Sequence, residues 1–94
     1  MITPYQKGYQ AELELIRRLK RRKDFYTVLR SAGSRSYFDI VAIGRNRILL
    51  IQVKSGKGKF RNERRKLRKL KVPKCARKQL KIYQKGRWKT VSVK

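Results

Sequence analysis

Residues 38–54 have the sequence FDIVAIGRNRILLIQVK, in which two apolar runs are joined by a short polar segment that begins at Gly44. A glycine followed by arginine and asparagine is typical of a tight turn, so the stretch predicts a β-hairpin. Both faces of each strand are apolar, which indicates strands buried on both sides of a sheet. Polar residues interrupt this pattern where Asp39 begins the first strand and where Gln52 and Lys54 end the second. Because a hairpin brings these ends together, an acid, an amide and an amine are expected to meet there.

The chain of 94 residues is long enough for one domain with one core, and we expect residues 1–94 to form it. It carries 29 Lys and Arg against 5 Asp and Glu, a formal net charge of +24. Such a charge opposes the compact state by self-repulsion, so a polyanion is the expected partner. Nucleic acid and an anionic membrane surface are the two candidates. A membrane span is not expected, because the longest uncharged run, Ile48–Val53, is far shorter than the ~20 residues that cross a bilayer.

The chain has one cysteine, Cys75, and no histidine. An internal disulfide, zinc sites built from Cys and His, and catalysis by Ser–His or Cys–His pairs are therefore excluded. The N-terminus lacks the apolar segment of a signal peptide, and the single cysteine fits a reducing cytosol, so we expect a cytoplasmic protein. If the protein binds a metal cation, the ligands must come largely from the few carboxylates, which are Glu12, Glu14, Asp24, Asp39 and Glu63.

Hydrophobic periodicity predicts further elements on either side of the hairpin. Expected helices cover residues 7–23 and 60–70, and expected strands cover 25–30, 38–44, 48–54, 75–83 and 87–93, with Lys85-Gly86 as the turn between the last two. In the first helix, Glu12 falls inside an apolar stripe that includes Tyr9, Ile16 and Leu19. A carboxylate there is costly unless it is paired, bound to a metal or at the edge of the stripe. From this pattern alone, a helix-edge glutamate paired with Arg or Lys is favoured over a functional role.

A helix glutamate, a small-residue loop and two polar strand ends therefore follow one another along the chain. Their segments are Lys7-Gly8-Tyr9-Gln10-Ala11-Glu12, Arg30-Ser31-Ala32-Gly33-Ser34, Phe38-Asp39-Ile40-Val41-Ala42 and Leu50-Ile51-Gln52-Val53-Lys54. This order resembles the PD-(D/E)xK nuclease superfamily and, more narrowly, the archaeal Holliday junction resolvases and their viral relatives, over about residues 7–54. The resemblance implies an α/β, restriction-endonuclease-like fold, with a central mixed β-sheet flanked by helices and the N-terminal helix first.

The resemblance also implies the residues of a magnesium-dependent nuclease site. Asp39 would be the central Mg²⁺ ligand, Glu12 would reach the metal directly or through a water, and the backbone carbonyl of Val53 would face it. Lys54 would orient or activate the attacking water. Gln52 occupies a position where the family pattern has an acid, although some branches of the superfamily carry Gln there. The expected catalytic residues are therefore Glu12, Asp39, Gln52 and Lys54.

Elementary chemistry supports the same kind of site. Mg²⁺ prefers hard oxygen ligands, lowers the pKa of a bound water and neutralises phosphate charge. A nearby lysine adds positive charge without competing for the metal. Gln52 offers an oxygen but no charge, so the affinity for metal should fall while coordination survives. We expect Mg²⁺ as the cofactor, with Mn²⁺ able to replace it.

The cations are expected to bind the DNA backbone, with an affinity that falls steeply as salt rises. The candidates lie in loops or beside the predicted site, together with two serines of the small-residue loop: Lys7, Arg30, Ser34, Arg35, Ser36, Lys57, Lys59, Arg61, Arg64 and Arg65. A resolvase must cut two strands symmetrically, which requires a twofold homodimer. The predicted function is thus cleavage of branched DNA, most specifically four-way junctions.

Two alternatives stay open at this stage. A nuclease of the same fold could act on flaps, nicks or ordinary duplex. A non-catalytic nucleic-acid-binding protein would have the same positive charge. Glu12, Asp39 and Lys54 discriminate against the second alternative, because a protein that only binds DNA has no need of carboxylates that repel phosphate.

Overall fold

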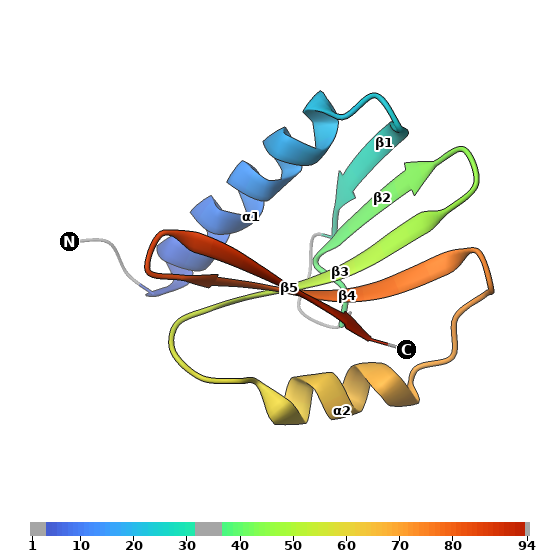
Figure 1. Ribbon diagram of the computed structural model, residues 1–94. Coiled ribbons are helices and arrows are strands. Elements are labelled where there is room, and N and C mark those ends of the chain that lie inside the picture. Colours follow the sequence, from blue (N-terminus) through green and yellow to red (C-terminus); the bar gives the residue numbers. More distant parts are fainter. Residues whose placement is uncertain (1–3, 32–36, 94) are drawn as a thin grey trace.

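The computed structural model describes residues 4–31 and 37–93, with side chains from residue 8 onward, and folds them into two helices and one mixed sheet (Figure 1). In chain order the elements are α1 (Pro4–Arg21), β1 (Phe25–Arg30), β2 (Ile40–Gly44), β3 (Ile48–Ser55), α2 (Arg61–Lys69), β4 (Ala76–Gln84) and β5 (Arg87–Val93). The N-terminal helix comes first, and the expected α/β class with a mixed sheet between helices is confirmed.

The sheet has the spatial order β1-β2-β3-β4-β5, so strands that are neighbours in the chain are also neighbours in space. All neighbouring pairs are antiparallel except β3 and β4, which run parallel. A parallel pair needs a connection that returns along the sheet, and α2 provides it. In Figure 1, α1 and α2 lie on opposite sides of the sheet, which gives three layers.

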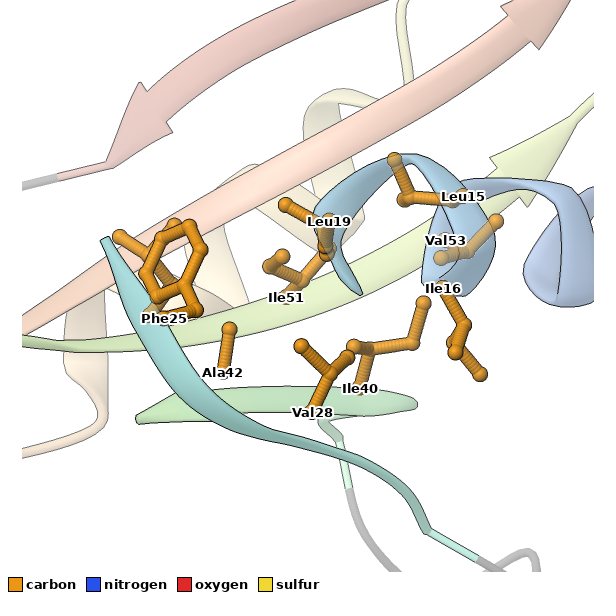
Figure 2. Close-up of a cluster of buried hydrophobic side chains, with 10 residues drawn as sticks. Leu15, Ile16, Leu19, Phe25, Val28, Ile40, Ala42, Ile51 and Val53 are labelled. Carbon is orange, nitrogen blue, oxygen red and sulfur yellow. The ribbon is translucent and has the colours of Figure 1, made fainter. Parts of the chain in front are cut away.

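Helix α1 covers the first three strands through its apolar stripe. Leu15, Ile16 and Leu19 are buried against Ile40 and Ile51 in one cluster (Figure 2). The helix begins three residues before the predicted Lys7, because a proline is well tolerated in the first turn, where its missing N–H has no helical partner. Tyr9, which belongs to the same stripe, is 39% exposed and lies at its edge.

Helix α2 covers β4 and β5 on the other face. Leu67 is fully buried with Leu80, Ile82 and Val93. Because this helix lies over the far half of the sheet, the second face of β2 and β3 is only half-buried. The expectation that both faces of these strands are fully buried therefore holds for the α1 face alone.

A buried lysine fixes the end of α2. The Nζ of Lys78, on β4, donates hydrogen bonds to the carbonyl oxygens of Leu67 at 2.6 Å, Arg68 at 3.2 Å and Leu70 at 2.9 Å. These are among the carbonyls that a helix leaves without partners at its C-terminus. Lys78 therefore binds two carbonyls of the last turn of α2 and the carbonyl of its C-terminal cap, Leu70, while it is only 7% exposed.

The two hairpins have the predicted turns, although β2 begins at Ile40, two residues later than predicted. In the first, Ile40 pairs with Ile51 and Ile43 with Ile48. In the second, the turn residues Lys85 and Gly86 have φ values of 50° and 77°, the left-handed pair that a two-residue hairpin requires. Neither helix of the described chain is long and apolar enough to cross a membrane.

Candidate active site

At one end of the sheet, the backbone of Asp39 forms hydrogen bonds to the neighbouring segments on both sides. The Asp39 N–H donates to the Ile51 carbonyl at 2.8 Å, and the Asp39 carbonyl accepts from the Ser31 N–H at 2.8 Å. Its carboxylate Oδ2 accepts the N–H of Val53 at 2.7 Å. Asp39 is thus fixed against the last residues of β3, immediately before Lys54, as the hairpin register predicted.

Glu12 reaches the same place from α1. Burial raises the pKa of the Glu12 carboxyl, and the negative charge of neighbouring Asp39 raises it further, while Arg30 opposes both effects. The side chain of Glu12 is 16% exposed, so this repulsion is only partly screened by water. Two carboxylates that repel each other in a partly buried position form a site that suits a divalent cation.

The pairing of Glu12 with an Arg or Lys, which the sequence favoured, is confirmed: its partner is Arg30, and Tyr9 lies beside that arginine. The Nε of Arg30 lies 3.4 Å from Glu12 Oε2, and the guanidinium lies 4.4 Å from the centre of the Tyr9 ring. The 3.4 Å separation is longer than a strong charge-assisted hydrogen bond. Arg30 therefore neutralises Glu12 only in part. The position of Tyr9 three residues before Glu12, on the same side of the helix, is the sequence signal that could have placed it here.

Gln52 and Val53 complete the set of residues at this end. Gln52 is the next residue after Ile51 on β3, which places it beside Asp39 in the antiparallel register. Its side-chain oxygen is buried and has no hydrogen-bond partner among the described residues. A buried, unpartnered carbonyl oxygen on the residue beside Asp39 is the kind of donor that Mg²⁺ accepts. The predicted ligand residues therefore fit a hard cation, although no group of three or more Asp, Glu, Cys or His residues occurs in the described part of the chain.

An open pocket of about 300 Å³ lies at the same place. Its lining combines the N-terminal part of α1, the end of β1 and the end of β3: Gly8, Tyr9, Glu12, Arg30, Val53, Lys54 and Ser55. Glu12 and Lys54 thus face one cavity from opposite elements. An open pocket with an acid, two cations and an aromatic ring suits an extended anionic substrate.

The predicted DNA-binding residues divide into three groups. Lys57, Lys59, Arg61 and Arg65 are exposed on the loop after β3 and on the first turns of α2, whereas Arg64 is half-buried. Arg30 lies at the site itself. Ser34, Arg35 and Ser36 lie outside the described residues, as does the side chain of Lys7, whose backbone belongs to α1.

The model of a family described as archaeal Holliday junction resolvase (hjc) matches residues 3–84, which includes every candidate site residue and ends at the last residue of β4. No curated protein matches the chain.

Proposed function

The chain belongs to the archaeal Holliday junction resolvase family, and on this premise we propose that it is a Mg²⁺-dependent endonuclease that cuts four-way DNA junctions. One observation carries the proposal of an active site: Glu12 and Asp39, from different elements, lie together beside Lys54. Two adjacent, partly buried carboxylates repel each other, and a bound cation would relieve that repulsion.

Each of these residues would have its own role in the reaction. Glu12 and Asp39 would hold Mg²⁺ by their carboxylates, with the Gln52 side-chain oxygen and the Val53 carbonyl as neutral ligands. The bound metal lowers the pKa of a coordinated water and offsets phosphate charge. Lys54 would orient the attacking water and stabilise the negative charge that builds on the phosphate. Mn²⁺, which accepts similar oxygen ligands, would replace Mg²⁺.

Arg30 has a second role in this proposal. Its guanidinium would bind a phosphate oxygen when Glu12 turns to the metal, because arginine recognises phosphate in a planar, bidentate geometry. The exposed cations of the loop after β3 and of α2 would extend the contact along the DNA backbone. A net charge of +24 supports binding that depends strongly on salt.

A junction is resolved by two cuts on opposite strands, so we propose a twofold homodimer with one active site in each copy. The half-buried apolar face of β2 and β3 is a surface that a second copy would cover. Burial of this face would also stabilise the fold of a small, highly charged domain. Light scattering combined with size-exclusion chromatography measures this directly, and a monomer at all concentrations contradicts it.

The experiment offers end-labelled four-way junction, flap, nicked duplex, intact duplex and single strand to the purified protein, with Mg²⁺, Mn²⁺ or chelator. We expect symmetric paired nicks in the junction with either metal and none with chelator. Cutting of flaps or duplex at the same rate as four-way junctions would mean that the enzyme acts on a broader class of DNA. If the protein binds all of these substrates but cuts none of them in either metal, the proposed enzyme activity is wrong and the protein only binds DNA.

A further inference from the structure

The hairpin of β4 and β5 ends beside the candidate active site, and its outer strand lies beyond the residues that the family match covers. In the parallel register of β3 and β4, Lys54 pairs with Ile82 and Ser55 with Tyr83. The hairpin turn therefore begins just past the strand end that carries Lys54. Figure 1 shows the turn at the same end of the molecule as the start of α1 and the loop after β3.

The register also places cations of β5 in line with Lys54. Ile82 pairs with Lys89, so Lys54, Ile82 and Lys89 form one row across three strands and share a face of the sheet. Two strand spacings separate Lys54 from Lys89, which is about 10 Å. Arg87 points to the same face two residues further toward the turn, where it pairs with Gln84.

These cations are exposed and unpaired. Arg87 and Lys89 are both exposed, and every ion pair between described residues involves Glu12, Glu14 or Asp24, none of which belongs to the hairpin. Cations without acidic partners on a surface next to a phosphodiesterase site are free to contact phosphate.

The hairpin is also attached to the loop that follows Lys54. The Gly56 N–H donates to the Tyr83 carbonyl at 3.1 Å, and Gln84 Nε2 donates to the Gly58 carbonyl at 2.9 Å. On the strand side, the Tyr83 and Trp88 rings lie 5.0 Å apart, and Trp88 packs against the α1 core. Hydrogen bonds and packing thus join the hairpin to the loop and to the end of β3, and they position its charges relative to Lys54.

We propose that Arg87 and Lys89 form a second contact with the DNA backbone, which binds phosphates next to the one that is cut. The inference rests on the proposed nuclease, because it assigns the flanking DNA to the β5 side of the active site. A two-stranded β-ribbon presents side chains from one face to a phosphate backbone without needing to recognise bases. Gln84 acts as a positioning residue, because it links the ribbon to the loop that carries Lys57 and Lys59.

The test compares two double variants with equal loss of charge. The first is R87Q/K89Q. The control is K23Q/R45Q, whose residues are exposed at the opposite end of the sheet, in the turns that precede β1 and follow β2. Binding of a four-way junction is measured in chelator across a range of salt concentrations, so that no cutting is needed for the readout.

Each phosphate contact contributes about 0.9 to the slope of log affinity against log salt concentration. R87Q/K89Q should therefore lower the slope by about two and weaken binding, while K23Q/R45Q should retain the slope of the unmodified protein. An unchanged slope for R87Q/K89Q would overturn the proposal. An equal decrease of the slope in the control would also overturn it, because the effect would then come from the overall charge and not from a defined contact.

The outcome separates this inference from the proposed function. If the protein binds junctions with the predicted slopes but never cuts them in Mg²⁺, the nuclease is wrong and the β5 contact stands. If it cuts junctions and R87Q/K89Q binds with an unchanged slope, the nuclease stands and the β5 contact is wrong.

Discussion

The two ends of the sheet use the same residue types for opposite purposes. At the end remote from the candidate site, Asp24 accepts hydrogen bonds from Arg22 at 3.0 and 2.7 Å and from Arg47 at 2.6 Å, and both guanidiniums lie over the Phe25 ring. Although burial opposes it, these hydrogen bonds lower the pKa of Asp24. The carboxylate is fully satisfied within the protein, and it joins two turns of the fold.

At the other end, Glu12 has one weak contact to Arg30, and its pKa is raised rather than lowered. Asp39 adds a second negative charge instead of neutralising the first. An acid that the protein satisfies is structural, and an acid whose charge the protein leaves uncompensated is available to a ligand. The two ends therefore differ less in composition than in how completely arginine pairs with the acid.

The largest expected effect tests this difference directly. Asp39→Asn should abolish detectable junction cutting, because it removes one of the two charges proposed to hold the metal, while junction binding in chelator should persist. The matched control is Asp24→Asn, which should cut at a rate close to that of the unmodified protein after its lower thermal stability is taken into account. Equal losses of cutting in both variants would erase the distinction between the two ends.

Lys54→Met should lower the cutting rate by roughly 10²–10³-fold, since it removes a cation that acts on charge developing in the reaction. Single-turnover kinetics with saturating Mg²⁺ separate this effect from binding. The control is Lys23→Met at the remote end, for which the rate should be retained. A Lys54 variant that cuts normally would mean that this lysine serves only to bind DNA.

Gln52→Glu should strengthen metal binding at the candidate site, because it adds a third negative charge. We expect the Mg²⁺ concentration for half-maximal cutting to fall by about tenfold, because a charged oxygen binds Mg²⁺ more strongly than a neutral one. Gln79→Glu is the control, since Gln79 also has a buried side-chain oxygen without a partner among the described residues. Metal dependence that stays the same in the Gln52 variant would remove this residue from the metal site.

Two glycines should show effects of opposite sign on stability. A Cβ at Gly44, at the remote end, would lie 2.8 Å from the Asp24 carbonyl oxygen, so Gly44→Ala should destabilise the fold by about 1–3 kcal/mol. A Cβ at Gly8, within α1, would meet nothing within 4 Å, so Gly8→Ala should stabilise it by roughly 0.5–1 kcal/mol. Urea unfolding followed by circular dichroism measures both, and shifts of the same sign would contradict the prediction.

The smallest effect is the pH dependence of stability. Asp24 has a folded-state pKa below its ordinary 3.8, so its contribution is present above that pH and is lost as the pH falls toward the folded-state value. Glu12 has a folded-state pKa above its ordinary 4.5, so stability declines as the pH rises through that window. In metal-free unfolding experiments, Asp24→Asn should be less stable than the unmodified protein near neutral pH, and Glu12→Gln should be equally or more stable. The two differences should shrink on acidification.

The sequence was sufficient for the order of the elements and for their approximate bounds. The apolar runs of β2 and β3 predicted the hairpin, its register and the meeting of Asp39 with the end of β3. The position of Glu12 within an apolar stripe marked it as unusual. Strand β1 was predicted with its observed bounds, because aromatic and β-branched residues between two turns leave little ambiguity.

Contacts between distant segments were not predictable in the same way. The pairing of Arg30 with Glu12 and Tyr9 depends on how α1 lies across the end of β1, which no local pattern specifies. The half-buried second face of β2 and β3 follows from where α2 crosses the sheet. Lys78 was also missed, although it shares the apolar face of Leu80 and Ile82 on β4, and that alternation would have indicated a buried lysine.

Lys78 has a practical consequence for anyone who redesigns this strongly basic chain. Of the 29 lysines and arginines, it is the one whose side chain is buried, among described residues, and its ammonium group is used entirely by the end of α2. Substitutions of exposed cations by glutamine or glutamate, made to lower the net charge, must leave this position unchanged. In amine-reactive mass labelling of the native protein, Lys78 should be the slowest lysine to acquire the tag, and its labelling would report the release of α2 from the sheet.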